Sequence, residues 1–271
     1  MPGERFFADA QNDKRKCAQN DKRKGARNDR LRNMDTELLN KTLADTGITT
    51  TTDQVKQLVR YYDLLMEKNK VMNLTAIKDP KEAAVKHFAD SLILTKYYEF
   101  RDGDRVLDLG TGGGFPGMPL KILYPDVFFL LMDSVNKKLN FIREAVEDLG
   151  LRNIEVLHGR AEDIAHSPEH RGKYDVVVSR AVAALPVLIE LSLGFVKPGG
   201  YFISYKGVSA GEEISASENA LKVMGGIVER VEEYSLPDTE ERRNLIFIRK
   251  TPTPSGNRYP RKPGLPGKTP L

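Results

Sequence analysis

The chain has 271 residues, a formal net charge of +4 and a single cysteine, Cys17. This length is enough for a large hydrophobic core and one or two domains. One cysteine excludes an intramolecular disulfide and a cysteine-based metal cluster, and we expect no metal site. The sequence contains no run of about 18 apolar residues and no secretory signal. We therefore expect a cytoplasmic protein that has no contact with a membrane.

The positive charge is confined to the two ends of the chain. Residues 1–33 carry a net charge of +5 and residues 251–271 a net charge of +4, which leaves −5 for residues 34–250. A polyanionic partner would therefore meet the ends or local patches rather than the body as a whole. Residues 1–33 contain the polar heptapeptide AQNDKRK twice and show no apolar periodicity. We interpret them as a disordered leader or as sequence upstream of Met34, with a basic nucleic-acid arm as the alternative.

Residues 34–100 are predicted to form a small helical cap. The first helix is expected to end at Gly47, the second to cover 53–70, and the third to begin at Asp79-Pro80. Apolar residues recur at i, i+3 and i+4 in these segments, as in amphipathic helices that bury one face. We expect this cap to pack on the edge of a sheet formed by the following residues.

From residue 105 to residue 250 apolar strands alternate with helices, which predicts a parallel sheet covered on both faces. The helix after the second strand is expected to be capped by Ser134 and ended by Gly150. The last two strands are about ten residues apart, too close for a crossover helix, so they must pair antiparallel. The predicted strands are 105–109, 127–132, 154–157, 175–179, 201–205, 226–231 and 243–249. The expected fold is therefore α/β, a seven-stranded Rossmann-like sheet with an antiparallel last strand, in a domain spanning 101–250.

The first of these strands runs into a glycine-rich turn that can be interpreted in two ways. Gly112-Gly-Gly114-Phe-Pro-Gly117 matches the G-x-G-x-x-G fingerprint of dinucleotide-binding proteins, and Asp133 follows at the expected distance. The other frame begins at Asp108 and places an acid at the tip of the strand, followed by glycines at every second position. That pattern is typical of methyltransferases that use S-adenosylmethionine (AdoMet).

Electrostatics and topology favour AdoMet over NAD. The carboxylate of Asp108 would repel a pyrophosphate but suits a ligand that carries an ammonium and a sulfonium. An antiparallel ending also differs from a dinucleotide-binding domain, which would add a second parallel half. Asp133, at the end of the second strand, is placed to accept hydrogen bonds from ribose hydroxyls. The segment Gly159-Arg-Ala-Glu-Asp163 follows the third strand, at a position where an acid or a backbone N–H can contact the adenine edge.

The tip of the fourth strand, Ser179-Arg180-Ala181, is where methyltransferases place the chemistry of the methyl acceptor. Amino-group methylases carry Asn/Asp-Pro-Pro-aromatic at this position, and that tetrapeptide is absent. Methylation of pyrimidine C5 needs a nucleophilic cysteine, and Cys17 lies in the leader. Both reaction types are therefore disfavoured. His87 and Asp90 share one turn of the third cap helix, and we expect them to make a polar contact between cap and sheet, with substrate contact as the alternative.

Several motifs occur in the order found in one family. They are Asn73-Leu-Thr-Ala, His87-Phe-Ala-Asp90-Ser-Leu, the glycine loop with Phe115-Pro-Gly, Leu131-Met-Asp133-Ser134, Arg160-Ala161-Glu162, Ser179-Arg180-Ala and Tyr205-Lys206-Gly. Together they resemble the RsmG (GidB) family of bacterial small-subunit ribosomal RNA methyltransferases. The resemblance covers about residues 34–250 and extends to the tail that begins at Arg258.

The resemblance implies methyl transfer from AdoMet to N7 of the guanine at position 527 of 16S rRNA, with free rRNA or the 30S particle as substrate. A methyltransferase acting on another RNA position or on a small molecule is the alternative, followed by an NAD-dependent oxidoreductase. We expect a monomer. The predicted cofactor residues, from the loop and from the resemblance, are Asp108, Gly110, Gly112, Phe115, Asp133, Ser134, Ala161, Glu162 and Arg180.

Arg180 is expected to hold the AdoMet carboxylate or an RNA phosphate, because a cation close to N7 would oppose the positive charge that develops there. Lys206 is predicted to contact RNA phosphate, although a solvated loop lysine fits equally. Residues 251–271 are predicted to be a flexible basic arm that uses Arg258, Arg261 and Lys262 on RNA, with an inert tail as the alternative.

Overall fold

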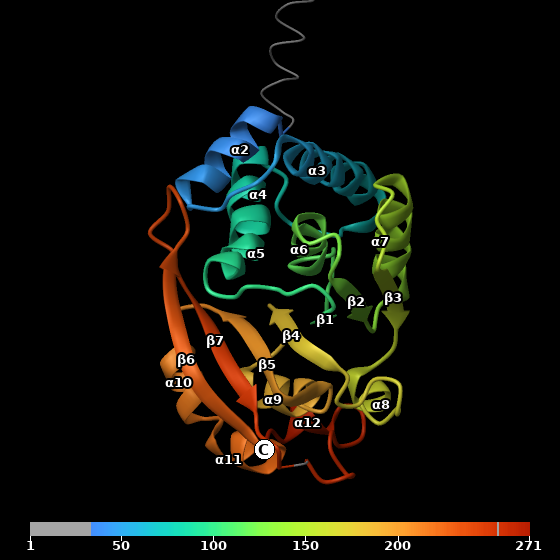
Figure 1. Ribbon diagram of the computed structural model, residues 1–271, viewed down its shortest axis with the longest axis vertical. Helices are drawn as coiled ribbons and strands as arrows, with labels where there is room; N and C mark the ends of the chain where they lie inside the picture. Colours follow the sequence, from blue (N-terminus) through green and yellow to red (C-terminus); the bar gives the residue numbers. More distant parts are fainter. Residues whose placement is uncertain (1–33, 254) are drawn as a thin grey trace, which may run out of the picture.

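The computed structural model describes residues 34–253 and 255–271 (Figure 1). The predicted leader, 1–33, lies outside the described residues. The helices are α2 (Thr36–Asp45), α3 (Thr52–Met72), α4 (Pro80–Ala83), the π-helical η1 (Ala84–Ala89), α5 (Asp90–Leu92), the 3-10 helix η2 (Ile93–Lys96), α6 (Gly117–Leu123), α7 (Asn136–Asp148), α8 (Ala161–Ile164), α9 (Leu185–Ser192), α10 (Ala210–Ser215), α11 (Glu218–Met224) and α12 (Leu265–Lys268). The strands are β1 (Arg105–Leu109), β2 (Phe128–Asp133), β3 (Ile154–His158), β4 (Tyr174–Arg180), β5 (Val196–Lys206), β6 (Gly226–Ser235) and β7 (Arg242–Lys250).

The strands form one sheet in the order β3-β2-β1-β4-β5-β7-β6. Strands β1 to β5 pair in parallel, and β7 pairs antiparallel with both β5 and β6. This confirms the predicted seven-stranded sheet with an antiparallel last strand. The strand order reverses between β1 and β4, and ligands of open α/β sheets bind at such a point, outside the carboxyl ends of the strands.

Side chains that alternate along the strands separate the interior into two hydrophobic clusters, one on each face of the sheet. Val106 and Phe129 belong to one cluster, and their neighbours Leu107 and Leu130 belong to the other. The cap helices lie on the same side as α6 and α7, whereas α9 to α12 lie on the opposite side (Figure 1). The sheet is therefore buried on both faces, as its apolar strands require.

The cap packs over one face of the sheet rather than on its edge, which corrects our expectation. Helix α3 contacts α6 and α7, the two helices that cover this face. The ring of Tyr61 on α3 lies 5.6 Å from that of Phe115 and 5.8 Å from that of Phe141. Cap and sheet residues therefore share one hydrophobic cluster. The physical reason is that α3 buries aromatic side chains, and the apolar side chains of the helices that cover this face provide the surface that buries them.

Two further local predictions need correction. Ser134 does not cap the helix after β2, because α7 begins two residues later with Val135 in the capping position and no side-chain cap. Residues 251–271 were expected as a flexible arm, but the described part, including α12, packs against α9. In the ranges 34–253 and 255–271, no helix combines the length and apolar character needed to cross a membrane.

Candidate active site

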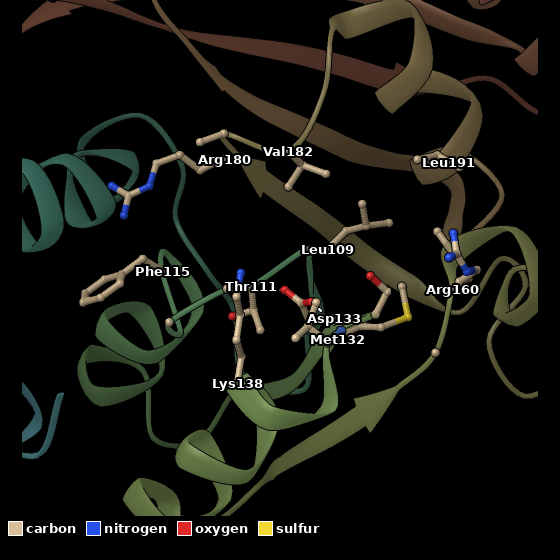
Figure 2. A pocket seen from close by; sticks show the side chains of 18 of the residues that line it. Leu109, Thr111, Phe115, Met132, Asp133, Lys138, Arg160, Arg180, Val182 and Leu191 are labelled. Atoms are coloured by element: carbon tan, nitrogen blue, oxygen red, sulfur yellow. Dashed lines mark hydrogen bonds between the residues drawn. The ribbon is translucent and has the colours of Figure 1, made fainter. Parts of the chain in front are cut away.

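A cavity of about 530 Å³ lies at the carboxyl ends of β1, β2 and β4 (Figure 2). Its volume is in the range of cofactor-binding clefts. Eight of the nine predicted cofactor residues line it, namely Gly110, Gly112, Phe115, Asp133, Ser134, Ala161, Glu162 and Arg180. The ninth, Asp108, is not among the lining residues. The structure thus brings together residues that are separated by up to 70 positions in the sequence.

The turn after β1 places backbone close to this cavity. Gly110 has a φ of +75°, and a Cβ at this position would overlap the side chain of Val182, which also lines the cavity. Glycine is required here for both reasons, since L-residues with a side chain rarely adopt a positive φ. The turn therefore depends on a missing side chain where β1 meets the tip of β4.

Replacing Gly110 by alanine is expected to weaken AdoMet binding about tenfold or more, because Val182 or the turn must move within the cavity. Gly103→Ala is the matched control, since Gly103 also has a positive φ, +88°, but nothing within 4 Å of an added Cβ. Both variants should lose about 1–2 kcal/mol of folding free energy from backbone strain. Calorimetric titration with AdoMet checks the prediction, and equal affinities in the two variants would contradict it.

Asp108 stabilises the glycine turn through two hydrogen bonds. Its side chain is buried, and Oδ2 accepts hydrogen bonds from Thr111 Oγ1 (2.6 Å) and from the backbone N–H of Gly117 (2.9 Å), the first residue of α6. Among the described residues, Oδ1 has no hydrogen-bond partner. The carboxylate thus occupies the start of α6, where a dinucleotide-binding protein would hold its pyrophosphate. This arrangement disfavours NAD, and it makes Asp108 a positioning residue rather than a direct ligand.

Burial raises the pKa of Asp108 from 3.8 to about 6, against the opposing effects of its two hydrogen bonds and of Arg180. Between these values the native protein holds a proton that the unfolded chain has released, so stability falls as pH rises from about 4 to about 6. Asp108→Asn should remove up to about 3 kcal/mol of this dependence. Urea unfolding of both proteins from pH 4 to pH 7 checks this, and parallel stability curves would contradict it.

Asp133, the last residue of β2, binds two backbone amides that frame the cavity. Oδ2 accepts from the N–H of Gly112 (2.9 Å) and Oδ1 accepts from the N–H of Val135 (2.8 Å). Each carboxylate oxygen can accept a further hydrogen bond. The side chain lines the cavity, so these free lone pairs suit a vicinal pair of ribose hydroxyls. The residues present therefore fit the nucleoside part of AdoMet.

The cap contributes three lining residues, Leu74, Thr75 and His87. Contact of Leu74 and Thr75 with the cavity was not predicted, and substrate contact by His87 was only the alternative. His87 stacks on Phe115 with ring centroids 4.4 Å apart, and its Nε2 lies 2.8 Å from Thr75 Oγ1. Burial, and secondarily Arg180, lowers the pKa of His87 to about 3. Its imidazole is therefore neutral at physiological pH. The motifs Asn73-Leu-Thr-Ala and His87-Phe-Ala-Asp90 of the resemblance contain these residues and could have indicated their place at the cavity. We had instead assigned His87 to a contact between cap and sheet.

Arg180, at the end of β4, lines the cavity and is also paired with the cap. Its Nη1 donates to Asp90 Oδ2 (2.7 Å) and to the carbonyl oxygen of Lys86 (3.1 Å). The guanidinium lies 5.6 Å from the centre of the Phe115 ring. Asp90 and Arg180 thus form the expected polar contact between cap and sheet. A bond from Arg180 to a ligand carboxylate or phosphate stays a prediction, and it would have to use the remaining N–H groups.

The predicted RNA-binding residues differ in whether their side chains form ion pairs within the protein and in how exposed they are. Lys206 donates to Glu213 (2.6 Å) and to the carbonyl oxygen of Ala183 (2.8 Å), and its side chain is only 9% exposed. A phosphate contact by Lys206 would require this ion pair to break. Arg261 is paired with Glu190, whereas Arg258 and Lys262 are exposed. For the described ranges, no cluster of three or more His, Cys, Asp or Glu side chains is arranged to hold a metal ion.

The sheet order, the glycine turn after β1 and the acid at the end of β2 define the class of Rossmann-like, AdoMet-dependent methyltransferases. The family model of rRNA small subunit methyltransferase G (GidB) matches residues 54–246. The chain belongs to the rRNA small subunit methyltransferase G family, as the sequence motifs predicted.

Two relatives of this family, 50% and 49% identical to this chain, agree with this assignment. The ribosomal RNA small subunit methyltransferase G of Lachnoclostridium phytofermentans is 50% identical over 230 residues, covering 84% of this chain and 94% of the relative. That of Desulforamulus reducens is 49% identical over 222 residues, covering 82% of this chain and 92% of the relative. Among solved structures, a SAM dependent methyltransferase from Aquifex aeolicus is similar with a TM-score of 0.48 and 22% identity, covering 65% of this chain and 96% of that one.

Proposed function

We propose that this enzyme transfers the methyl group of AdoMet to N7 of the guanine at position 527 of 16S rRNA. Membership of the family supports an rRNA substrate. The observation that carries the function is the cavity at the strand ends in a chain that belongs to this family. The resemblance implies the choice of N7, and the cavity is compatible with it, because the imidazole of His87 is neutral and Arg180 is paired with Asp90. A substrate of this kind would place the enzyme in the cytoplasm. The monomeric state stays a prediction.

Guanine N7 carries a lone pair in the plane of the ring and no proton, so the acceptor needs neither a general base nor a covalent nucleophile. AdoMet supplies a methyl group on a positively charged sulfur. The protein has to align the base with that methyl group, which is a positioning task. The lining residues offer apolar surface for it, since Val135 and Val182 are 44% and 41% exposed at the cavity.

Positive charge moves to the base as the methyl group is transferred, so an uncompensated cation nearby would raise the barrier. Two groups on the cap side of the cavity meet this requirement, whereas Lys138 and Arg160 also line the cavity as cations. His87 stays neutral because its pKa is near 3. The charge of Arg180 is offset by Asp90 at 2.7 Å. On the cofactor side, Asp133 would accept hydrogen bonds from the ribose hydroxyls, and Ala161 and Glu162 would contact the adenine.

The test uses tritiated AdoMet with 30S subunits and with naked 16S rRNA from a strain that lacks the corresponding methyltransferase. The expected product is labelled N7-methylguanosine at position 527, and comparison of the two substrates identifies the one that the enzyme prefers. The target guanine must be unpaired or flipped out, because duplex grooves hide the geometry needed. Label in another nucleoside would keep the reaction class and overturn the target. Binding of AdoMet without any transfer to RNA would favour a small-molecule acceptor.

A further inference from the structure

The C-terminal residues 255–271 lie against α8 and α9 (Figure 1). They also contact Glu162, which lines the cavity. We propose that this segment, which we call the C-terminal strap, positions α8 and thereby sets the affinity for AdoMet. The proposal rests on the AdoMet site described above. It gives the strap a role in the cofactor site, where the sequence alone had predicted an RNA-binding arm.

Arg261 anchors the strap to the body of the protein. Its partner, Glu190 on α9, is fully buried. Glu190 Oε1 accepts from the backbone N–H of Arg261 (2.7 Å) and from its Nε (2.9 Å), and Oε2 accepts from Nη2 (2.7 Å). A buried carboxylate must be paired to remain charged in the interior. Glu190 therefore fixes both the main chain and the side chain of the strap at one point.

From this anchor the strap contacts α8 and the residues that directly follow it. The N–H of Gly264 donates to Glu162 Oε1 (3.1 Å), and the carbonyl oxygen of Pro260 lies 2.8 Å from His166 Nε2. A third connection runs through Arg171, whose Nη1 donates both to the carbonyl oxygen of Ala165 (3.1 Å) and to that of the strap residue Tyr259 (2.9 Å).

Helix α8 needs such support because it has only four residues, Ala161–Ile164. A helix this short has no stability of its own in water and takes its position from its tertiary contacts. Its first two residues, Ala161 and Glu162, line the cavity. One of the two carboxylate oxygens of Glu162 is already held by the strap, which fixes the side chain. Loosening the strap would therefore loosen one wall of the cofactor cavity.

The test compares Arg261→Ala with Lys268→Ala in the full chain. Both variants remove one positive charge from the strap, but the Lys268 side chain is exposed and only Arg261 binds Glu190. Arg261→Ala is expected to weaken AdoMet binding about tenfold in calorimetric titrations without RNA, because a small displacement of α8 misplaces two lining residues. Lys268→Ala should bind AdoMet like the wild type. Hydrogen exchange of amides 161–166 should accelerate in Arg261→Ala alone.

A second variant covers the case in which Arg261→Ala does not fold. His166→Ala removes the contact with Pro260 without leaving a buried charge unpaired, and it should also accelerate exchange in α8 and weaken AdoMet binding. Wild-type exchange and affinity in a folded Arg261→Ala or, failing that, in His166→Ala would overturn the proposal. Weaker RNA binding with unchanged AdoMet affinity would also overturn the proposal, and it would support an RNA-binding role for the strap. If the wild type itself does not bind AdoMet, the proposed function fails, while hydrogen exchange still reports whether the strap holds α8.

Discussion

Replacing Asp133 by alanine is expected to weaken AdoMet binding about a hundredfold (about 2.7 kcal/mol). The carboxylate makes two hydrogen bonds within the protein, to the N–H groups of Gly112 and Val135, and is placed to accept the ribose hydroxyls as well. Hydrogen bonds to a charged group contribute about 1.5–3 kcal/mol each. Loss of the side chain therefore removes ligand contacts and also frees the glycine turn. Calorimetric titration with AdoMet measures the effect.

Two further variants separate these contributions. Asp133→Asn keeps one carbonyl oxygen but turns an amide donor toward one of the two N–H groups, so it should lose most of the affinity too. Asp163→Ala removes an exposed acid from α8 that does not line the cavity, and it should bind AdoMet like the wild type. An affinity of Asp133→Ala within about threefold of that of Asp163→Ala would remove Asp133 from the cofactor site.

Most of the sheet could be predicted because its signals are local. Apolar runs such as Val176–Val178 stand between turns, and the short interval between β6 and β7 leaves no choice but antiparallel pairing. The glycine turn was also recognisable, since the requirement for glycine at Gly110 follows from a backbone conformation that other residues avoid. Of the nine predicted cofactor residues, the eight that line the cavity lie at the carboxyl ends of strands or in the segments that follow them.

Contacts between distant segments were not predictable in the same way. Nothing local indicates that His87 stacks on Phe115, because the packing of the cap depends on how α3 covers α6 and α7. The literal G-x-G-x-x-G match was misleading for a related reason. Whether the N–H of Gly117 is available to a phosphate depends on Asp108, nine residues earlier, which already occupies it.

The C-terminal residues show how composition alone can mislead. Four basic residues among prolines and glycines suggested a flexible arm, yet Arg261 is fixed by Glu190. A signal was present on the other side of this contact. Glu190 lies in the apolar segment Leu185–Ser192 of α9, and a buried acid needs a cation from elsewhere. Buried charges in apolar segments thus carry information about long-range partners that tail composition does not.

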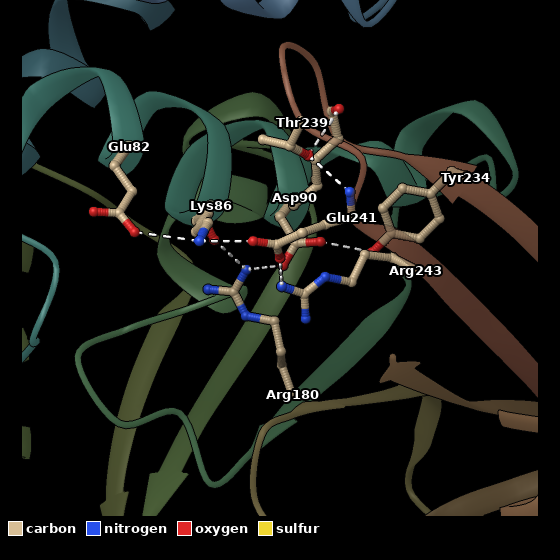
Figure 3. A network of polar contacts seen from close by, with 9 residues as sticks. Glu82, Lys86, Asp90, Arg180, Tyr234, Thr239, Glu241 and Arg243 are labelled. Atoms are coloured by element: carbon tan, nitrogen blue, oxygen red, sulfur yellow. Dashed lines mark hydrogen bonds and ion pairs between the residues drawn. The ribbon is translucent and has the colours of Figure 1, made fainter. Parts of the chain in front are cut away.

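A network of ion pairs joins the cap, β4 and the β6–β7 hairpin beside the active site (Figure 3). Its inner part is Asp90, which is 5% exposed and accepts from Arg180 Nη1 and from the hydroxyl of Tyr234, each at 2.7 Å. Its outer part is the pair of Lys86 and Glu241, separated by 2.8 Å, with side chains 27% and 39% exposed. The same network therefore contains a buried and a half-exposed ion pair that can be compared directly.

Asp90→Ala is expected to lower the free energy of unfolding by about 3–5 kcal/mol, because it leaves Arg180 with an uncompensated charge in a mostly buried position. Lys86→Ala should cost clearly less, since water screens an exposed pair and solvates the partner that remains. Urea unfolding at neutral pH measures both values. The difference between the two free energies of unfolding also tests the role of Arg180. If its guanidinium mainly bound the cofactor, the protein would lose little stability when Asp90 is removed. Equal losses in the two variants would contradict the view that the Asp90–Arg180 pair holds the cap against the cofactor cavity.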